Sequence, residues 1–211
     1  MAVETTLVDH PVCTDALAQI RDVATPNALF RQNLERIGAL LLAEATRHLP
    51  TVDGTVETPL TTAPATRIAV QPVVVPILRA GLGFVGPAQE LLPNADFGFI
   101  GMARNEETHQ PEPYVNKLPE SLRGRPVIVI DPMLATGGSL IHTLRLLLER
   151  DAPQPITVVC ALAAPEGIAA LDAADLSVNL VTAAIDDHLN GDAFIVPGLG
   201  DAGDRQFGTP A

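Results

Sequence analysis

Aromatic side chains are scarce in this sequence, which has six phenylalanines, one tyrosine and no tryptophan. Proteins that bind single-stranded nucleic acid stack its bases on aromatic side chains, so this composition offers no stacking platform. Basic residues are also few, at 13 against 25 acidic ones, and Lys117 is the single lysine. The resulting net charge of −12 repels both nucleic acid and anionic lipid. We therefore predict that the protein binds neither nucleic acid nor a membrane.

Cysteines and long apolar runs are equally sparse. Cys13 and Cys160 lie far apart, which favours two free thiols in a reducing compartment. The longest apolar stretch, 156–164, is much shorter than the roughly 20 residues that a membrane span needs. Residues 1–5 have neither a basic start nor an apolar run, so no signal peptide is expected. These features predict a cytoplasmic protein.

The apolar residues that are present predict the fold class. A chain of 211 residues with 47% hydrophobic residues suits a single globular domain with one buried core. Its β-branched apolar runs do not alternate with polar residues, which is typical of strands buried on both faces. Because helical segments separate these runs, we predict an α/β fold with a parallel-sheet core wrapped by helices. Strands are expected at 73–78, 97–102, 127–130, 156–162 and 178–184, and helices at 83–92, 138–150 and 165–174.

The other segments carry weaker signals. Thr25-Pro26 predicts a helix start with Thr25 as the N-cap, and the apolar residues from Phe30 to His48 then recur on one face. Residues 50–67 are interpreted as a loop or an edge hairpin. The polar, proline-rich segment 103–120 predicts a projecting β-arm or flap. The tail 191–211 is rich in Gly and Asp and shows no helix pattern, so it is either disordered or an irregular ligand-binding loop.

The most informative segment runs from Val127 to Ser139, where an apolar strand ends at Asp131 and a loop with two glycines leads into a helix. Ligands of open α/β sheets bind at the carboxyl ends of the strands. The glycines let the backbone approach a ligand, and the helix start favours a phosphate. Thr136 and Ser139 can donate to that phosphate, while Asp131 can accept from the hydroxyls of an attached ribose. The segment therefore predicts a site for a phosphorylated sugar.

Other phosphate-binding motifs fit this segment less well. The sequence has no Gly-Lys-Ser/Thr, which excludes a Walker loop, and no Gly-x-Gly-x-x-Gly followed by a distant acid. The remaining alternative is that Thr136–Ser139 is an ordinary turn between a strand and a helix.

Five blocks of this sequence resemble one known family. Asp131–Ser139 resembles the phosphoribosyl pyrophosphate signature of type I phosphoribosyltransferases. Most of that superfamily has two adjacent acids here, whereas Pro132 after Asp131 is similar to the uracil phosphoribosyltransferase family. Four further blocks resemble that family in order, so that the resemblance covers nearly the whole chain. They are Val75–Gly83, Gly101–Thr108, Ala163–Ile168 and Pro197–Asp204.

The resemblance implies a fold, a reaction and partners. It implies a single phosphoribosyltransferase domain over 1–211, with a flap at about 103–120 and a C-terminal hood over uracil at about 186–211. The implied pentosyltransferase moves the phosphoribosyl group of 5-phospho-α-D-ribose 1-diphosphate to N1 of uracil and releases UMP and diphosphate. Mg²⁺ is the expected cofactor, held by substrate and water without a direct protein ligand. A homodimer or larger homo-oligomer is expected, and GTP is an effector in part of the family.

Two arginines are expected to hold the diphosphate of the donor. A guanidinium fork matches phosphate oxygens, and the resemblance places Arg79 and Arg104 on that side, with Arg104 stabilising the leaving diphosphate. The resemblance also implies a cis peptide bond after Leu78. The expected donor-binding residues are Arg79, Arg104, Asp131, Pro132, Met133, Leu134, Ala135, Thr136, Gly137, Gly138, Ser139 and Asp201.

Uracil is expected at the C-terminal loop. Its edge alternates acceptor, donor and acceptor, which backbone groups can match, whereas cytosine would leave buried groups unpaired. Asp201 is also a candidate to draw the proton from uracil N1. The family usually has tyrosine at Phe194, so one hydrogen bond at the rim is lost, with activity expected to survive. The uracil contacts implied by the resemblance are Ile195, Gly200, Asp201 and Ala202.

Two other functions and two minor interpretations stay open. A regulatory RNA-binding protein could use the same scaffold, although the isoelectric point of about 4.6 argues against it. A transferase for another base is the third function, against which the Gly-Asp-Ala sequence at 200–202 argues. Tyr114 and Lys117 of the flap are candidates to close over the site. Asp186 and Asp187 are interpreted as a helix or turn cap.

Overall fold

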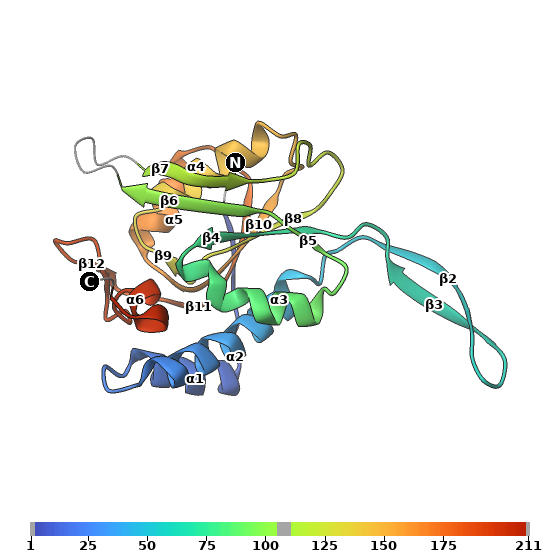
Figure 1. Cartoon of the computed structure of the whole chain (residues 1–211), viewed down its shortest axis with the longest axis horizontal. Helices are drawn as coiled ribbons and strands as arrows, with labels where there is room; N and C mark the ends of the chain where they lie inside the picture. The colour runs from blue at the N-terminus through green and yellow to red at the C-terminus, as the bar shows by residue number, and fades with distance from the viewer. Residues whose placement is uncertain (1–2, 105–110, 210–211) are drawn as a thin grey trace.

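A mostly parallel central β-sheet organises the chain (Figure 1). The structure is a computed structural model that describes residues 3–104 and 111–209. The strand order is β1-β11-β10-β8-β4-β6-β7, in which only β6 and β7 pair antiparallel among the described residues. The strands of this path are β1 Glu4–Leu7, β4 Val73–Leu78, β6 Phe99–Arg104, β7 Pro111–Lys117, β8 Val127–Ile130, β10 Ile156–Ala163 and β11 Val178–Ile185. Two short strands join it, β5 Asp96–Phe97 beside β4 and β9 Met133–Leu134 beside β10.

Helices cover both faces of this sheet, so its strands contact apolar side chains on two sides. Every residue of β8 is buried, and its side chains alternate between the two cores. Ile128 and Ile130 pack with α1, α2 and α3, whereas Val127 and Val129 pack with α4 and α5. This confirms the α/β fold and the buried parallel strands that the sequence predicts. The helices are α1 Pro11–Arg21, α2 Asn27–Ala45, α3 Val85–Leu91, α4 Gly138–Leu148 and α5 Pro165–Ala173, with a 3₁₀ helix η1 at Ala80–Phe84.

The helix boundaries differ from the prediction at several points. Pro26, not Thr25, is the N-cap of α2, because the Thr25 hydroxyl instead donates to the carbonyl oxygen of Gln19 at 2.6 Å. The helix also ends at Ala45, so that His48 lies outside it and is exposed. The helix expected over 83–92 is divided between η1 and α3.

Two hairpins lie outside the layered body or at its edge. Strands β2 (Thr51–Glu57) and β3 (Thr62–Ile68) form an antiparallel hairpin that stands away from the body (Figure 1). Of the loop or edge hairpin expected there, the hairpin is confirmed, but it forms a sheet of its own and not an edge of the main sheet. The segment 103–120, expected to project, instead supplies the end of β6 and all of β7 at the edge of the main sheet. Its residues 105–110 lie outside the described part of the chain. The arm that stands away from the body is therefore β2–β3.

The C-terminal segment is more regular than its composition indicates. The prediction of no helix is wrong, because α6 spans Ala202–Phe207. Asp201 caps this helix, with its Oδ1 accepting from the backbone N–H of Asp204 at 2.8 Å. Before it, β12 (His188–Leu189) and β13 (Ile195–Val196) pair antiparallel. Within residues 3–104 and 111–209, no helix is long and apolar enough to cross a membrane.

The packing of α2 on η1 gives a test of the fold. A Cβ on Gly38 of α2 would lie 2.5 Å from Cδ1 of the fully buried Phe84. Gly→Ala within a helix normally stabilises by about 0.5–1 kcal/mol, but overpacking costs about 1–3 kcal/mol. We expect Gly38→Ala to lower the free energy of unfolding, measured by urea denaturation.

The matched control is Gly86→Ala in α3, where the nearest atom to the new Cβ is 4.0 Å away. This variant should gain up to about 1 kcal/mol of stability. If both variants are stabilised alike, α2 does not pack on Phe84 as described.

Candidate active site

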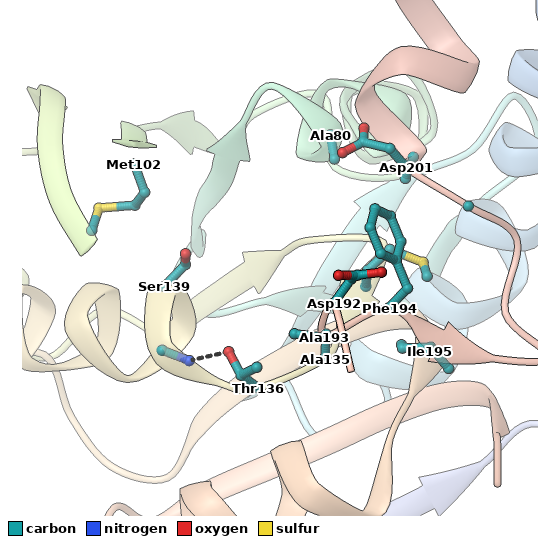
Figure 2. Close-up of a pocket in the computed structure, with 14 residues that line it drawn as sticks. Ala80, Met102, Ala135, Thr136, Ser139, Asp192, Ala193, Phe194, Ile195 and Asp201 are labelled. Atoms are coloured by element: carbon teal, nitrogen blue, oxygen red, sulfur yellow. Dashed lines mark hydrogen bonds between the residues drawn. The ribbon is translucent and has the colours of Figure 1, made fainter. Parts of the chain in front are cut away.

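A cavity of about 480 Å³ opens at the carboxyl ends of β4 and β8. In Figure 2, Thr136 and Ser139 lie on one side of it and Phe194 and Ile195 on the other. Segments from four separate parts of the chain meet here, as the parallel sheet predicts. The residues that line the cavity are Ala80, Met102, Met133, Ala135, Thr136, Gly138, Ser139, Asp192, Ala193, Phe194, Ile195, Gly200, Asp201 and Ala202.

The segment 131–139, called the phosphate loop from here on, links β8 to α4. Gly137 is the N-cap of α4 with φ of +80°, a left-handed conformation that favours glycine. The backbone N–H groups in the first turn of a helix have no partner within that helix, and the helix dipole makes this end favourable for an anion. The hydroxyl of Thr136 is exposed beside this turn and accepts weakly from the N–H of Gly138 at 3.5 Å. The loop therefore combines the donors that a phosphate group needs.

Asp131 is the first residue of the phosphate loop and directly follows β8. Its side chain accepts from the backbone N–H of Met133, which favours the carboxylate, but burial is the larger effect and raises the pKa of Asp131 to about 7. The neighbouring Cys160 on β10 is also buried. Burial, with a smaller contribution from the Asp131 charge, raises the pKa of this thiol to about 12. Both cysteines are free, as the sequence predicts, and the structure buries both of them.

Arg79 connects the two sides of the cavity. It follows β4 after a cis peptide bond from Leu78, which confirms that expectation. Its Nη2 atom donates to Oδ1 of Asp204 on α6 at 2.9 Å, and its guanidinium group lies against Gly203. Arg79 itself does not line the cavity, although Ala80 beside it does. For Arg104 the structure describes the backbone only, at the end of β6 opposite Pro111.

The C-terminal hood, residues 186–209, closes the other side of the cavity. The turn between β12 and β13 is held by Oδ1 of Asn190, which accepts from the N–H groups of Asp192 and Phe194. This turn brings the side chain of Phe194, 45% exposed, to the rim. The carboxylates of Asp192 and Asp201 also line the cavity, so oxygen atoms face it from two sides. The described residues contain no cluster of three or more His, Cys, Asp or Glu side chains that could hold a metal ion.

The structure brings together most of the expected site residues. Nine of them line the cavity: Met133, Ala135, Thr136, Gly138, Ser139, Ile195, Gly200, Asp201 and Ala202. Four others lie next to it without lining it, namely Asp131, Pro132, Leu134 and Gly137. Pro132 and Leu134 are buried, and the carbonyl oxygen of Pro132 accepts from the N–H groups of Ala161 and Leu162 on β10.

Some lining residues were not predicted from the sequence. Ala80 and Met102 belong to blocks that carry the family resemblance, so their position was a usable signal. Asp192 and Ala193 had only a turn composition to mark them. Of the helix or turn cap expected at Asp186, the structure shows a carboxylate that accepts from the backbone N–H of Gly198 in a turn, and it also shows an ion pair with Arg21 of α1 at 2.6 Å that was not predicted.

A cavity at the carboxyl ends of parallel strands, between a phosphate loop and a C-terminal hood, defines the class of type I phosphoribosyltransferases. The fold agrees with this class: a hypoxanthine-guanine phosphoribosyltransferase from Bacillus anthracis is similar with a TM-score of 0.51 and 16% identity, covering 76% of this chain and 80% of that one. At this identity the similarity shows the fold alone.

The particular family follows from closer relatives. The family model described as uracil phosphoribosyltransferase matches residues 7–209. The uracil phosphoribosyltransferase of Corynebacterium diphtheriae is 52% identical over 205 residues, 97% of each chain. A solved structure of a protein from Aquifex aeolicus has a TM-score of 0.90 and 36% identity, covering 97% of this chain and 98% of that one. The chain belongs to the uracil phosphoribosyltransferase family, which confirms the resemblance.

The raised pKa of Asp131 predicts a pH-dependent stability. At low pH the carboxyl is protonated in both the folded and the unfolded chain and has no effect. As pH rises toward about 7, the unfolded chain ionises first, so the folded state loses stability, and the loss is complete above that pH. Asp131→Asn should therefore exceed the wild type in free energy of unfolding at pH 8, by at most about 4 kcal/mol.

The measurement is urea denaturation of both proteins at pH 5 and pH 8. The advantage of Asp131→Asn should be small at pH 5 and larger at pH 8. A difference between the two proteins that does not change with pH would contradict a raised pKa for Asp131.

Proposed function

We propose that this protein transfers the phosphoribosyl group of 5-phospho-α-D-ribose 1-diphosphate to N1 of uracil, with UMP and diphosphate as products. The observation that supports this most is one cavity that joins the phosphate loop to the C-terminal hood, in a chain of the uracil phosphoribosyltransferase family. The activity in the printed names of the Corynebacterium relatives supports the same reaction.

In this proposal the donor lies along the phosphate loop. Its 5′-phosphate accepts from backbone N–H groups at the start of α4 and from the hydroxyls of Thr136 and Ser139, which line the cavity. The ribose hydroxyls donate to Asp131 at the end of β8. Because these donors favour the ionised carboxylate, donor binding would lower the pKa of Asp131 from about 7.

The diphosphate lies on the side of Arg79 and Arg104. Arg79 already pairs with Asp204 and is 45% exposed, so its guanidinium has N–H groups that can turn toward a second anion. We propose that Arg104 stabilises the charge that develops on the leaving diphosphate. The net charge of −12 makes such local cations necessary, since the protein as a whole repels an anionic donor.

Uracil lies under the hood, against Ile195 and the segment Gly200–Ala202, which all line the cavity. Backbone N–H and C=O groups there would match the edge of uracil and leave an unpaired group opposite cytosine. Asp201 Oδ1 is already the cap of α6, so Oδ2 is the oxygen that would draw the proton from N1.

In the reaction, the bond between C1′ and the diphosphate oxygen breaks and its electron pair leaves with diphosphate. The N1–C1′ bond forms as the N1 proton leaves. The residues hold N1 in line with the breaking bond and stabilise the departing charge. Mg²⁺, when bound with the diphosphate and water, neutralises part of that charge. Asp192 and Asp201 supply carboxylate oxygens of the kind that suits the water shell of Mg²⁺. Homo-oligomer formation, activation by GTP and a cytoplasmic location stay predictions from the sequence.

The reaction is tested by a spectrophotometric assay with the donor, Mg²⁺ and one of four bases: uracil, cytosine, hypoxanthine or orotate. We expect UMP from uracil, and a kcat/KM at least about 100-fold lower for each other base, because their edges leave buried polar groups unpaired. Similar rates with cytosine, or no product with uracil, would overturn the proposal.

The ribose contact is tested by Asp131→Asn. Loss of a charged acceptor should weaken binding of the donor by roughly 10-fold or more, measured by calorimetry at pH 8. Asp53→Asn in the β2–β3 arm, which removes the same charge far from the cavity, is the control and should bind the donor as the wild type does. Equal affinity in the two variants would contradict the role of Asp131.

A further inference from the structure

A buried ion pair ties the first long helix to the C-terminal hood. Arg21 is the last residue of α1, and Asp186 follows β11. The two side chains pair through both arms of the guanidinium fork, with Nη2 to Oδ1 at 2.6 Å and Nη1 to Oδ2 at 2.8 Å. The Asp186 side chain is 4% exposed and that of Arg21 is 24% exposed. Burial and the two-point geometry fix the position of both groups.

The same two side chains hold a single residue of the hood from both sides. Nη1 of Arg21 donates to the carbonyl oxygen of Gly198 at 2.9 Å, and the N–H of Gly198 donates to Oδ2 of Asp186 at 2.9 Å. Gly198 has a φ of +60°, and a Cβ there would lie 2.0 Å from the carbonyl oxygen of Ile195. The turn at Gly198 is therefore narrow and held at both of its peptide groups.

This turn lies between the two parts of the expected base site. Ile195 precedes it and Gly200–Ala202 follow it, and all of these line the cavity. Neither Arg21 nor Asp186 lines the cavity, so neither is placed to touch a substrate. Among the described residues, the side-chain hydrogen bonds of Arg21 and Asp186 reach the base site through the backbone of Gly198.

Stability alone does not explain this arrangement. A buried ion pair usually contributes little to stability compared with apolar side chains of the same size. The hydrogen bonds outside the ion pair indicate another role, because Arg21 and Asp186 each also bind a peptide group of Gly198. Backbone groups that recognise the edge of a base must be held in a defined direction.

We propose that Arg21 is a positioning residue for the base site, which acts through Asp186 and Gly198 to orient the backbone groups of Gly200–Ala202 toward uracil. The proposal rests on the proposed function for its kinetic test. Arg21 and Asp186 bind the backbone of Gly198 and belong neither to the cavity lining nor to the phosphate loop, so we expect the larger effect on uracil.

The first experiment compares Arg21→Met with the wild type in the uracil assay. Methionine keeps the apolar stem of the arginine side chain but lacks the guanidinium group and its N–H donors. We expect the KM for uracil to rise at least fivefold, while the KM for the donor stays within twofold. The matched control is Arg36→Met, which removes an arginine of α2 that pairs with Asp15 of α1 at 3.4 Å and touches no hood residue; both of its KM values should stay within twofold.

A second variant covers the case in which Arg21→Met leaves a buried charge and fails to fold. Arg21→Met combined with Asp186→Asn removes both charges and keeps an oxygen that can accept from the N–H of Gly198. It should show the same selective rise in the KM for uracil. A normal uracil KM in a folded variant, or equal changes for both substrates and for Arg36→Met, would overturn the proposal.

Hydrogen exchange separates this proposal from the proposed function. The amides of residues 198–202 should exchange at least fivefold faster in the Arg21 variants than in the wild type, and at the wild-type rate in Arg36→Met. If the wild type makes no UMP, the proposed function fails, and the exchange rates alone then decide the positioning role. Unchanged exchange at 198–202 in both Arg21 variants would refute it.

Discussion

The site depends on one packing constraint, the parallel pairing of β4 and β8 in the middle of the sheet. Val73 to Pro76 pair with Val127 to Ile130, and the paired residues are buried. Since both strands run in the same direction, the segments that leave them emerge at the same edge. Arg79 and the phosphate loop are neighbours for this reason, although they are far apart in the sequence. Loss of the buried register would separate the groups on which every proposed contact with the donor depends.

The second theme is the use of charge in an acidic protein. Two of the side chains proposed to bind the anionic donor have a charge that the structure disfavours or neutralises. Burial disfavours the charge on Asp131, and Asp204 neutralises Arg79. The raised pKa of Asp131 means that its charge lowers the stability of the fold near neutral pH. Such a carboxyl is more typical of a functional site than of an ordinary strand end.

The sequence predicts the parts of the fold that are set by local patterns. The buried strands are recognisable because apolar β-branched runs form where both faces are covered, and the phosphate loop because its glycines and hydroxyls are contiguous. The helix α6 could not be recognised, since its six residues are too few to show a period and lie among Gly and Asp. Aspartate is a favoured N-cap residue, so Asp201 was the available sign that a helix begins there.

Long-range polar contacts were beyond the sequence. Asp186 reads as a cap because carboxylates near turns usually are, and its partner Arg21 is 165 residues away. The sequence could not show which of the segments 50–67 and 103–120 stands away from the body, because both have strand-like halves and a polar turn. Which of them joins the sheet depends on the apolar edge that β6 offers, with the buried Ile100 packed beside β4.

The bridge from Arg79 to Asp204 has a thermodynamic consequence. Arg79 follows β4, and its guanidinium group pairs with Asp204 in α6. A movement of either segment therefore changes the electrostatic free energy of the other. An anion that draws Arg79 away from Asp204 leaves α6 with an uncompensated carboxylate, and a ligand that shifts α6 changes how strongly Arg79 attracts an anion. Linkage is reciprocal, so the two ligands would alter each other's affinity by the same factor. The Arg79–Asp204 pair would thus add a coupling through the protein to the direct contact that the proposed reaction requires between the two substrates.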